Sequence, residues 1–180
     1  MSEPLAITED LCLNNGLWRF AGQLWSRPDA QEAALMLQDL GWSVTDILGA
    51  LWLTKLRQPF KGLNSPLLLL WRSQVTSSLR KVRKNIAKNH PATDQARRSV
   101  AQSELEAEKV ELALAFQALA TTEGSLMAPV DMPIRTLAMD NLKAAAPEPE
   151  QIMDHETGKL LERLIDELQL LIKKGQQPCS

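Results

Sequence analysis

Apolar residues recur along most of this chain at steps of three and four, the spacing that places them on one face of an α-helix. The sequence has no sustained alternation of Val, Ile or Thr, which is the pattern of strands. Prolines, glycines and capping residues divide the pattern into successive helices. We expect these helices at about residues 14–26, 28–40, 43–58, 65–88, 94–120, 134–145 and 149–174. The fold class that follows is all-α, an irregular helical bundle.

The helices expected at 65–88 and 94–120 are separated only by a short segment around His90 and Pro91. A connection of this length favours an antiparallel helical hairpin. Folding at this turn brings Arg80 near Glu104, and it brings Arg72 near Glu111 by the same register. Opposite charges then meet along the seam, where each exposed pair contributes at most about 1 kcal/mol.

Charge is distributed unevenly along the sequence. Residues 1–54 carry two basic and seven acidic side chains, residues 55–98 carry eleven and one, and residues 99–180 carry seven and fourteen. The net charge of −2 for the whole chain therefore conceals a strongly positive middle third. By its position, most of this positive charge belongs to the hairpin.

At the hairpin tip, the end of the hairpin beside its turn, the charge pairing fails because only Asp94 lies near the basic side chains. Exposed positive charge of this kind suits phosphate groups, as in RNA, or an acidic partner. The alternative is an ordinary solvated helix end that binds nothing. The candidate residues for an anionic partner are Lys81, Lys84, Lys88, Arg97 and Arg98.

Prolines interrupt short apolar pieces after residue 120, which predicts a linker at 121–147. The linker separates a helical core domain at 1–120 from an amphipathic helix and tail at 148–180. The apolar face of that helix needs a partner, and three are possible: the core of the same chain, a second copy of the chain, or another protein. Its candidate docking residues are Leu161, Ile165, Leu168 and Ile172.

No residue pattern with recognised chemistry rises above background. The sequence lacks a glycine-rich phosphate loop and a Gly-x-Ser-x-Gly elbow, and its two histidines and two cysteines have no metal-ligand spacing. We expect no catalytic residue, no metal and no cofactor. A ligand cleft lined by tryptophan stays open as an alternative, and Trp42, beside Gly41 at a turn, is the tryptophan that we expect to be partly exposed. The five tryptophans are Trp18, Trp25, Trp42, Trp52 and Trp71.

A set of short motifs runs through the first two thirds of the chain. The motifs are Leu17-Trp18-Arg19-Phe20-Ala21, Leu24-Trp25-Ser26-Arg27-Pro28, Leu37-Gln38-Asp39, Leu51-Trp52-Leu53, Leu79-Arg80-Lys81-Val82-Arg83 and Glu104-Leu105-Glu106-Ala107-Glu108. Together they resemble a small proteobacterial family of conserved hypothetical proteins, over about residues 14–120. The resemblance implies a helical fold in the bacterial cytoplasm, but no reaction, and it leaves the last 60 residues outside.

These observations favour a non-enzymatic protein-interaction or adaptor protein that binds another protein, or a second copy of itself, through its C-terminal helix. One alternative is a nucleic-acid or ribosome-associated protein that uses the basic hairpin tip, and a second is a small-ligand carrier or enzyme with a Trp-lined cleft. The sequence begins with no basic and apolar leader, and no apolar run approaches the roughly 20 residues of a membrane span. We therefore expect a cytoplasmic location.

Overall fold

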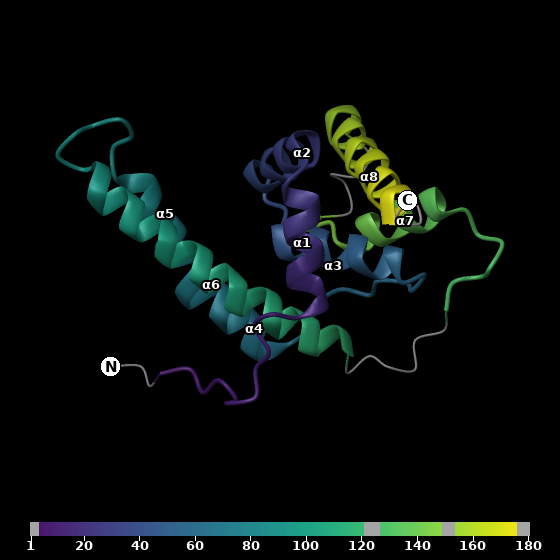
Figure 1. Cartoon of the computed structure of the whole chain (residues 1–180), viewed down its shortest axis with the longest axis horizontal. Coiled ribbons are helices and arrows are strands. Elements are labelled where there is room, and N and C mark those ends of the chain that lie inside the picture. The colour runs from purple at the N-terminus through teal and green to yellow at the C-terminus, as the bar shows by residue number, and fades with distance from the viewer. Residues whose placement is uncertain (1–3, 121–126, 149–153, 176–180) are drawn as a thin grey trace, which may run out of the picture. The chain divides into compact units, whose positions relative to one another are not determined.

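The computed structural model describes residues 4–120, 127–148 and 154–175. Within these ranges the regular structure is helical and no strand occurs, which confirms the all-α fold class. None of the helices in these ranges is long and apolar enough to cross a membrane. The elements in Figure 1 are α1 (Gly16–Trp25), α2 (Pro28–Asp39), α3 (Val44–Lys55), α4 (Pro66–Trp71), the π-helical segment η1 (Arg72–Thr76), α5 (Ser77–Asn85), α6 (Asp94–Ala120), α7 (Ile134–Ala144) and α8 (His155–Gly175).

The chain divides into two compact units, with the boundary inside α1. Unit 1 comprises residues 1–18 and 64–118, and it contains α4, η1, α5 and most of α6. Unit 2 comprises residues 19–63 and 119–180, and it contains α2, α3, α7 and α8. This division differs from the boundaries expected from the sequence, because α2 and α3 belong with the C-terminal helices rather than with the hairpin.

Helix starts follow the capping residues that the sequence offers. The Ser43 hydroxyl accepts a hydrogen bond from the Asp46 amide at 3.2 Å, at the start of α3. The Ser65 hydroxyl accepts one from the Leu68 amide at 3.4 Å, at the start of α4, where Pro66 occupies the first helical position. Each cap satisfies an amide that the helix itself leaves without a partner.

In unit 1, α4, η1 and α5 follow one another without a break and lie beside α6 (Figure 1). The Trp71 indole donates a hydrogen bond to the Ala107 carbonyl of α6 at 3.0 Å. The helix expected at 65–88 contains an unpredicted π-helical turn, and it ends at Asn85 rather than at 88. The chain leaves the helix at Ile86, whose ψ is 126°, and the Arg97 guanidinium donates to the carbonyls of Arg83 and Ile86, which the helix end leaves without helical partners.

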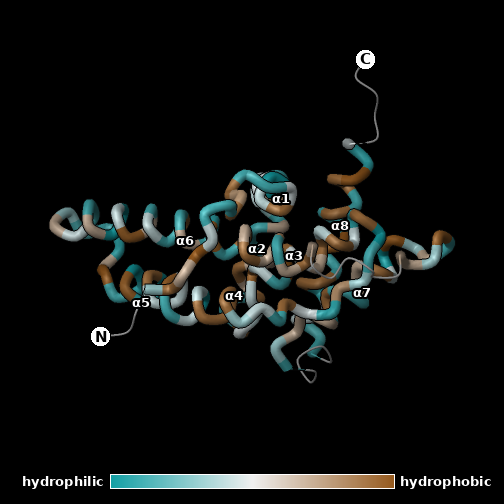
Figure 2. Tube along the Cα trace, turned by 90° about the horizontal axis from the view of Figure 1, so that it is seen from below, coloured by the Kyte–Doolittle hydropathy of each residue, from teal (hydrophilic) through white to brown (hydrophobic). Residues whose placement is uncertain are grey.

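Unit 2 has a core built from residues far apart in the sequence. Helix α8 packs on α2, α3 and α7, and α7 also packs on α3. The large side chains of α8 that form this core are fully or almost fully buried, and they are Leu160, Leu161, Leu164, Ile165 and Leu168. Figure 2 shows hydrophobic and hydrophilic positions alternating along α8, as its amphipathic sequence predicts.

The predicted linker is wrong for the part of it that the structure describes. Helix α7 forms close to its expected bounds and is part of the core of unit 2. Its Asn141 is only 2% exposed, which a linker residue would not be. The Asn141 side chain accepts from the Phe60 amide at 2.7 Å and donates to the Thr54 hydroxyl and the Gln58 carbonyl at 2.9 Å each. It also donates to the Ala50 carbonyl of α3 at 3.3 Å, and a buried amide with these four partners fixes α7 on α3.

The expectation that Trp42 is partly exposed is wrong, because Trp42 is only 2% exposed. Gly41 has a φ of 94°, which turns the chain back at the end of α2. The Trp42 amide then donates to the Leu37 carbonyl at 3.0 Å, as in a Schellman motif. The apolar residue after such a glycine packs back on the helix, so the turn buries Trp42.

Candidate functional site

Arginine and lysine occupy different positions on the first helix of the hairpin. Arg80 binds Glu104 at 3.0 Å and Glu108 at 2.6 Å, and Arg83 also binds Glu104. One helix earlier, Arg72 binds Glu111 at 2.8 Å. The pairs Arg80–Glu104 and Arg72–Glu111 are those that the sequence predicts. The segment that contains Arg72 and Arg80 therefore runs in the opposite direction to α6, which contains Glu104 and Glu111.

Two glutamates of this seam have shifted pKa values. Burial by itself raises the pKa of Glu104, but the hydrogen bonds and charges of Arg83 and Arg80 outweigh it, so the pKa of Glu104 is lowered. The pKa of Glu108 is raised, first by partial burial and further by the like charges of Glu104 and Glu111. Glu104 therefore stays ionised and holds two arginines, which is a structural role.

The lysines of the candidate site lie outside the seam. Lys81 and Lys84 on α5, and Lys88 in the turn, are all exposed. Arg98 is also exposed and forms an ion pair with Asp94 at 2.9 Å, one turn earlier in α6. The prediction for the fifth residue, Arg97, is corrected, because its guanidinium donates to the backbone carbonyls of Arg83 and Ile86 within the hairpin. We call Lys81, Lys84, Lys88 and Arg98 the basic surface.

Apolar side chains are exposed at the same level of the hairpin. Val82 is 48% exposed and Leu105 is 47% exposed. Both lie level with Lys81 and Lys84, since Arg80 and Arg83 bind Glu104, the residue before Leu105. The charge pattern alone did not indicate this exposed apolar area at the level of the basic surface.

The prediction of a docking face on the C-terminal helix is wrong, because this face of α8 is buried within unit 2. Leu161, Ile165 and Leu168 are at most 1% exposed, because α2, α3 and α7 cover that side of α8 within unit 2. Ile172, one turn further, is half-buried. The apolar face is the core of unit 2, and a partner cannot reach those three residues in the folded chain.

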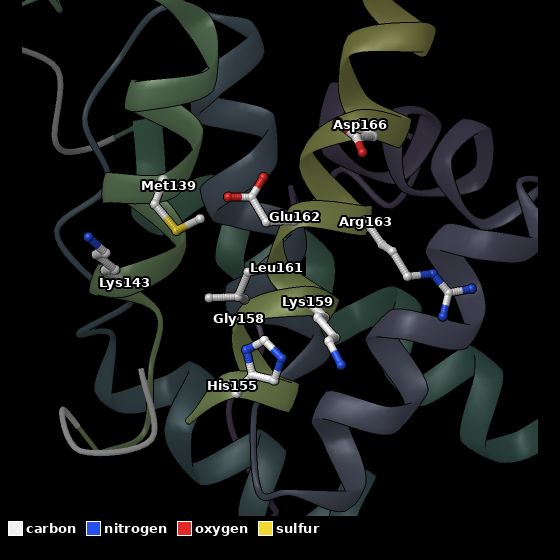
Figure 3. Close-up of a pocket in the computed structure, with 9 residues that line it drawn as sticks. All are labelled: Met139, Lys143, His155, Gly158, Lys159, Leu161, Glu162, Arg163 and Asp166. Atoms are coloured by element: carbon white, nitrogen blue, oxygen red, sulfur yellow. The ribbon is translucent and has the colours of Figure 1, made fainter. Parts of the chain in front are cut away.

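A groove along α7 and α8 is a site that the sequence reasoning missed (Figure 3). Its volume is about 610 Å³, within the range of small-molecule pockets. No tryptophan is among its lining residues, which are Met139 and Lys143 of α7 and His155, Gly158, Lys159, Leu161, Glu162, Arg163 and Asp166 of α8. The only sequence signal for it was the lone Gly158 inside an otherwise strong helix.

The tryptophans are engaged in packing within each unit. In unit 2, Trp52 packs on Phe20 with ring centroids 5.6 Å apart, and Lys55 lies over both rings. In unit 1, the Lys109 ammonium lies 5.4 Å from the Trp18 ring. These contacts give the rings aromatic and cation–π partners from the protein itself.

Comparison with protein families gives one result. A family model described as a protein of unknown function, DUF2390, matches residues 16–114. The match covers more than half of the 180 residues. The chain belongs to the DUF2390 family. No curated protein and no solved structure matches the chain.

The DUF2390 match separates the two surfaces described above. The match to residues 16–114 includes the hairpin seam, the basic surface and Leu105. It ends before α7 and α8, so the groove lies outside the DUF2390 match. Among the residues that the structure describes, no cluster of His, Cys, Asp and Glu is suited to a metal ion. The hairpin surface is thus the candidate site within the family match.

Proposed function

We propose that this chain is a non-enzymatic interaction protein of the bacterial cytoplasm, whose basic surface binds an acidic segment of another protein. The observation that carries the proposal is the segregation of Arg80 and Arg83 into the seam while Lys81 and Lys84 are exposed. Planar guanidinium groups suit fixed carboxylate pairs, whereas lysine suits a mobile contact in water. The seam therefore holds its arginines in carboxylate pairs, and the lysines lie at exposed positions of the same hairpin.

Exposed apolar area favours a protein partner over a nucleic acid. Protein interfaces combine an apolar centre with a polar rim, and Leu105 supplies exposed apolar area at the level of Lys81 and Lys84 on the hairpin. Single-stranded nucleic acids are commonly bound by stacking bases on aromatic rings. Between residues 72 and 98 the sequence holds no Phe, Tyr or Trp. A partner that presents acidic residues around one or two apolar side chains complements this surface best.

Two variants, each with three lysine substitutions, test whether the basic surface binds an acidic protein segment. One variant carries Lys81→Gln, Lys84→Gln and Lys88→Gln, and the control carries Lys61→Gln, Lys173→Gln and Lys174→Gln. Both remove the same net charge, so any non-specific effect of charge is equal. The probe is a synthetic helical peptide with glutamates flanking two leucines. We expect its dissociation constant to rise about tenfold in the first variant and less than about twofold in the control.

Leu105→Ser separates the apolar contribution from the charge. If a protein segment docks here, this change weakens peptide binding about fivefold without altering its salt dependence. A single-stranded RNA oligonucleotide is the competing probe. Tighter binding of RNA than of the peptide, with a steep loss in salt that the three-lysine variant flattens, would reject a protein partner in favour of nucleic acid. Equal peptide binding by both lysine variants would reject the surface altogether.

A further inference from the structure

The ion pair between Arg80 and Glu108 marks one flank of the hairpin in unit 1, where α5 lies beside α6 (Figure 1). These two side chains bind each other at 2.6 Å, and the Glu108 side chain is 39% exposed, which places the pair at the edge of the seam. Residues two positions apart in a helix point in nearly opposite directions. Val82, two residues after Arg80, and Val110, two residues after Glu108, therefore lie together on the opposite flank.

Both helices continue this opposite flank with uncharged residues at steps of three and four, the spacing of one helix face. The residues are Leu79, Val82 and Ile86 along and at the end of α5, and Ala96, Val100, Ser103, Ala107 and Val110 of α6. We call them the uncharged flank. Helix α6 carries eight charged residues between positions 94 and 111, and none of them falls on this flank. Charge is thus excluded from one side of a hairpin that is otherwise highly charged.

The uncharged flank leaves aliphatic surface accessible. Val82 is 48% exposed, and Ser103 of α6 is exposed as well. The other aliphatic side chains longer than alanine are only half-buried, and they are Leu79, Ile86, Val100 and Val110. The flank also stands at about a right angle to the seam. In a four-helix bundle each helix contacts two neighbours in this way, so an antiparallel hairpin has the geometry of half a bundle.

The two helices contribute side chains of different size to the uncharged flank. Helix α5 contributes leucine, valine and isoleucine, whereas α6 contributes alanine, serine and valine. The register of the seam, set by the two arginines that bind Glu104, places Val82 level with Ser103 and Leu79 level with Ala107. A row of large side chains therefore runs beside a row of smaller ones, with a large and a small residue at the same level.

We propose that the uncharged flank binds the same flank of a second copy of the chain, so that two hairpins form a four-helix bundle. The two-fold axis runs along the hairpins, which packs α5 of one copy on α6 of the other at the same level. Val82 then lies against the partner's Ser103, and Leu79 lies against the partner's Ala107. The large row of each copy meets the small row of the other, and no like charges are brought together.

Sedimentation velocity of the full chain at several concentrations tests the dimer. The interface is small and apolar, so we expect a dissociation constant of about 10 μM. Ser103→Glu places a carboxylate against the partner's Val82 and should raise this constant at least about 100-fold. Ser77→Glu is the matched control and should change it less than about threefold, because Ser77 is exposed and lies one turn before Arg80, on the other flank.

The two glutamate variants should have the same helix content by circular dichroism, because both serines are exposed. Ser103→Ala provides a second check, since it keeps the side chain small and adds a better helix former. The dimer should persist in this variant. Dissociation by Ser103→Glu together with an intact Ser103→Ala dimer would show that the introduced charge, and not a loss of helix, separates the copies.

Cysteine trapping tests how the two copies are arranged. The native Cys12 and Cys179 are first replaced by serine, so that each chain has one thiol. A chain with Val82→Cys is then mixed with a chain with Ser103→Cys and oxidised. We expect a mixed disulfide, because these positions face each other across the two-fold axis at the same level. A chain with Ser77→Cys, on the other flank, should give no mixed disulfide with Ser103→Cys.

Three results would overturn the proposal. The first is a chain that stays monomeric up to about 200 μM, well above the expected dissociation constant. The second is an equal effect of Ser103→Glu and Ser77→Glu, which would mean that the copies associate through another surface, such as one on unit 2. The third is a disulfide between two chains with Val82→Cys in preference to the mixed pair, which would exclude the packing of α5 on α6.

Discussion

The two units are both helical, but they bury different kinds of side chain. Helix α8 of unit 2 buries a continuous row of leucine and isoleucine, whereas α5 of unit 1 buries none of its residues. In unit 1 the seam is instead held by Glu104 and Glu111, two acids that are at most 5% exposed and are paired with arginines. Helix α8 is thus held in unit 2 by a row of apolar side chains, whereas α5 is held against α6 in unit 1 by arginine–glutamate pairs.

This difference has a consequence for how each unit responds to solution conditions. The burial of hydrocarbon is insensitive to pH and is not weakened by moderate salt. Ion pairs between partly exposed groups are screened by salt and are lost when a carboxylate is protonated. Glu104 should therefore make the stability of unit 1 depend on pH, whereas the contribution of the buried leucines of α8 to unit 2 should not change with pH.

The largest expected effect is on the core of unit 2. Leu164 is fully buried, so Leu164→Ala should lower the free energy of unfolding of unit 2 by about 3 kcal/mol, since it leaves a cavity among α2, α3 and α7. Urea denaturation monitored by circular dichroism measures the loss. Leu170→Ala on the same helix is the control, because Leu170 is 45% exposed and should change stability by less than about 0.5 kcal/mol. Equal losses would contradict the core assigned to α8.

A smaller loss is expected from the seam of unit 1. Glu104→Gln removes the charge that Arg80 and Arg83 share, and it leaves two partly buried guanidinium groups without that carboxylate. We expect about 2 kcal/mol less protection of the α6 amides, measured by hydrogen exchange. Glu106→Gln is the matched control, because Glu106 is exposed and accepts a hydrogen bond from the neutral side chain of Gln102. Its change should stay within about 0.5 kcal/mol.

The effect of Glu104→Gln on the stability of unit 1 should also depend on pH. The pKa of Glu104 is lowered in the folded chain, so its contribution to stability is complete above the ordinary glutamate pKa of about 4.3. That contribution disappears as the pH falls through the lowered folded value. The difference between the wild-type chain and Glu104→Gln should therefore be largest at neutral pH and should shrink in acid. A difference that does not change with pH would mean that Glu104 acts through packing alone.

Local structure could be predicted well from the sequence because local signals determine it. The hairpin register follows from a short turn, so the pairs of Arg80 with Glu104 and Arg72 with Glu111 could be named in advance. Helix α7 was expected at 134–145 and lies at 134–144, because prolines and its apolar spacing delimit it. Each of these features depends on residues that are near one another in the chain or across a single turn.

Long-range packing could not be predicted, and the candidate sites were wrong where they depended on it. The periodicity of α8 shows that Leu161 and Ile165 need a partner, but it does not say that α2 and α7 provide one. Arg97 was assigned to the basic tip from its charge alone. Its guanidinium binds the backbone carbonyls of Arg83 and Ile86, and no sequence pattern predicts these contacts. The groove is lined by residues of both α7 and α8, so it depends on how these two helices pack, which the sequence alone does not show.

The smallest expected effect has the opposite sign and tests the charge account of unit 1 most sharply. The pKa of Glu108 is raised by partial burial and by its acidic neighbours, so its ionised form is less favourable in the folded chain than in the unfolded chain. Stability linked to this group is present below about pH 4.3 and is lost as the pH rises through the folded pKa. Glu108→Gln should therefore stabilise unit 1 at neutral pH, by at most about 0.5 kcal/mol because the carboxylate is partly exposed.

This gain should vanish in acid, where Glu108 is protonated in both the folded and the unfolded chain. Hydrogen exchange of the α6 amides at two pH values measures it beside Glu104→Gln, whose effect also shrinks in acid but begins as a loss. If Glu108→Gln destabilised unit 1 as much as Glu104→Gln does, its 2.6 Å bond to Arg80 would outweigh burial and like-charge repulsion. The ion pairs of Glu104 and Glu108 would then be equivalent. They are expected to differ, because Glu104 stabilises unit 1 by binding two arginines, whereas the charge of Glu108 is disfavoured by burial and by the neighbouring acids.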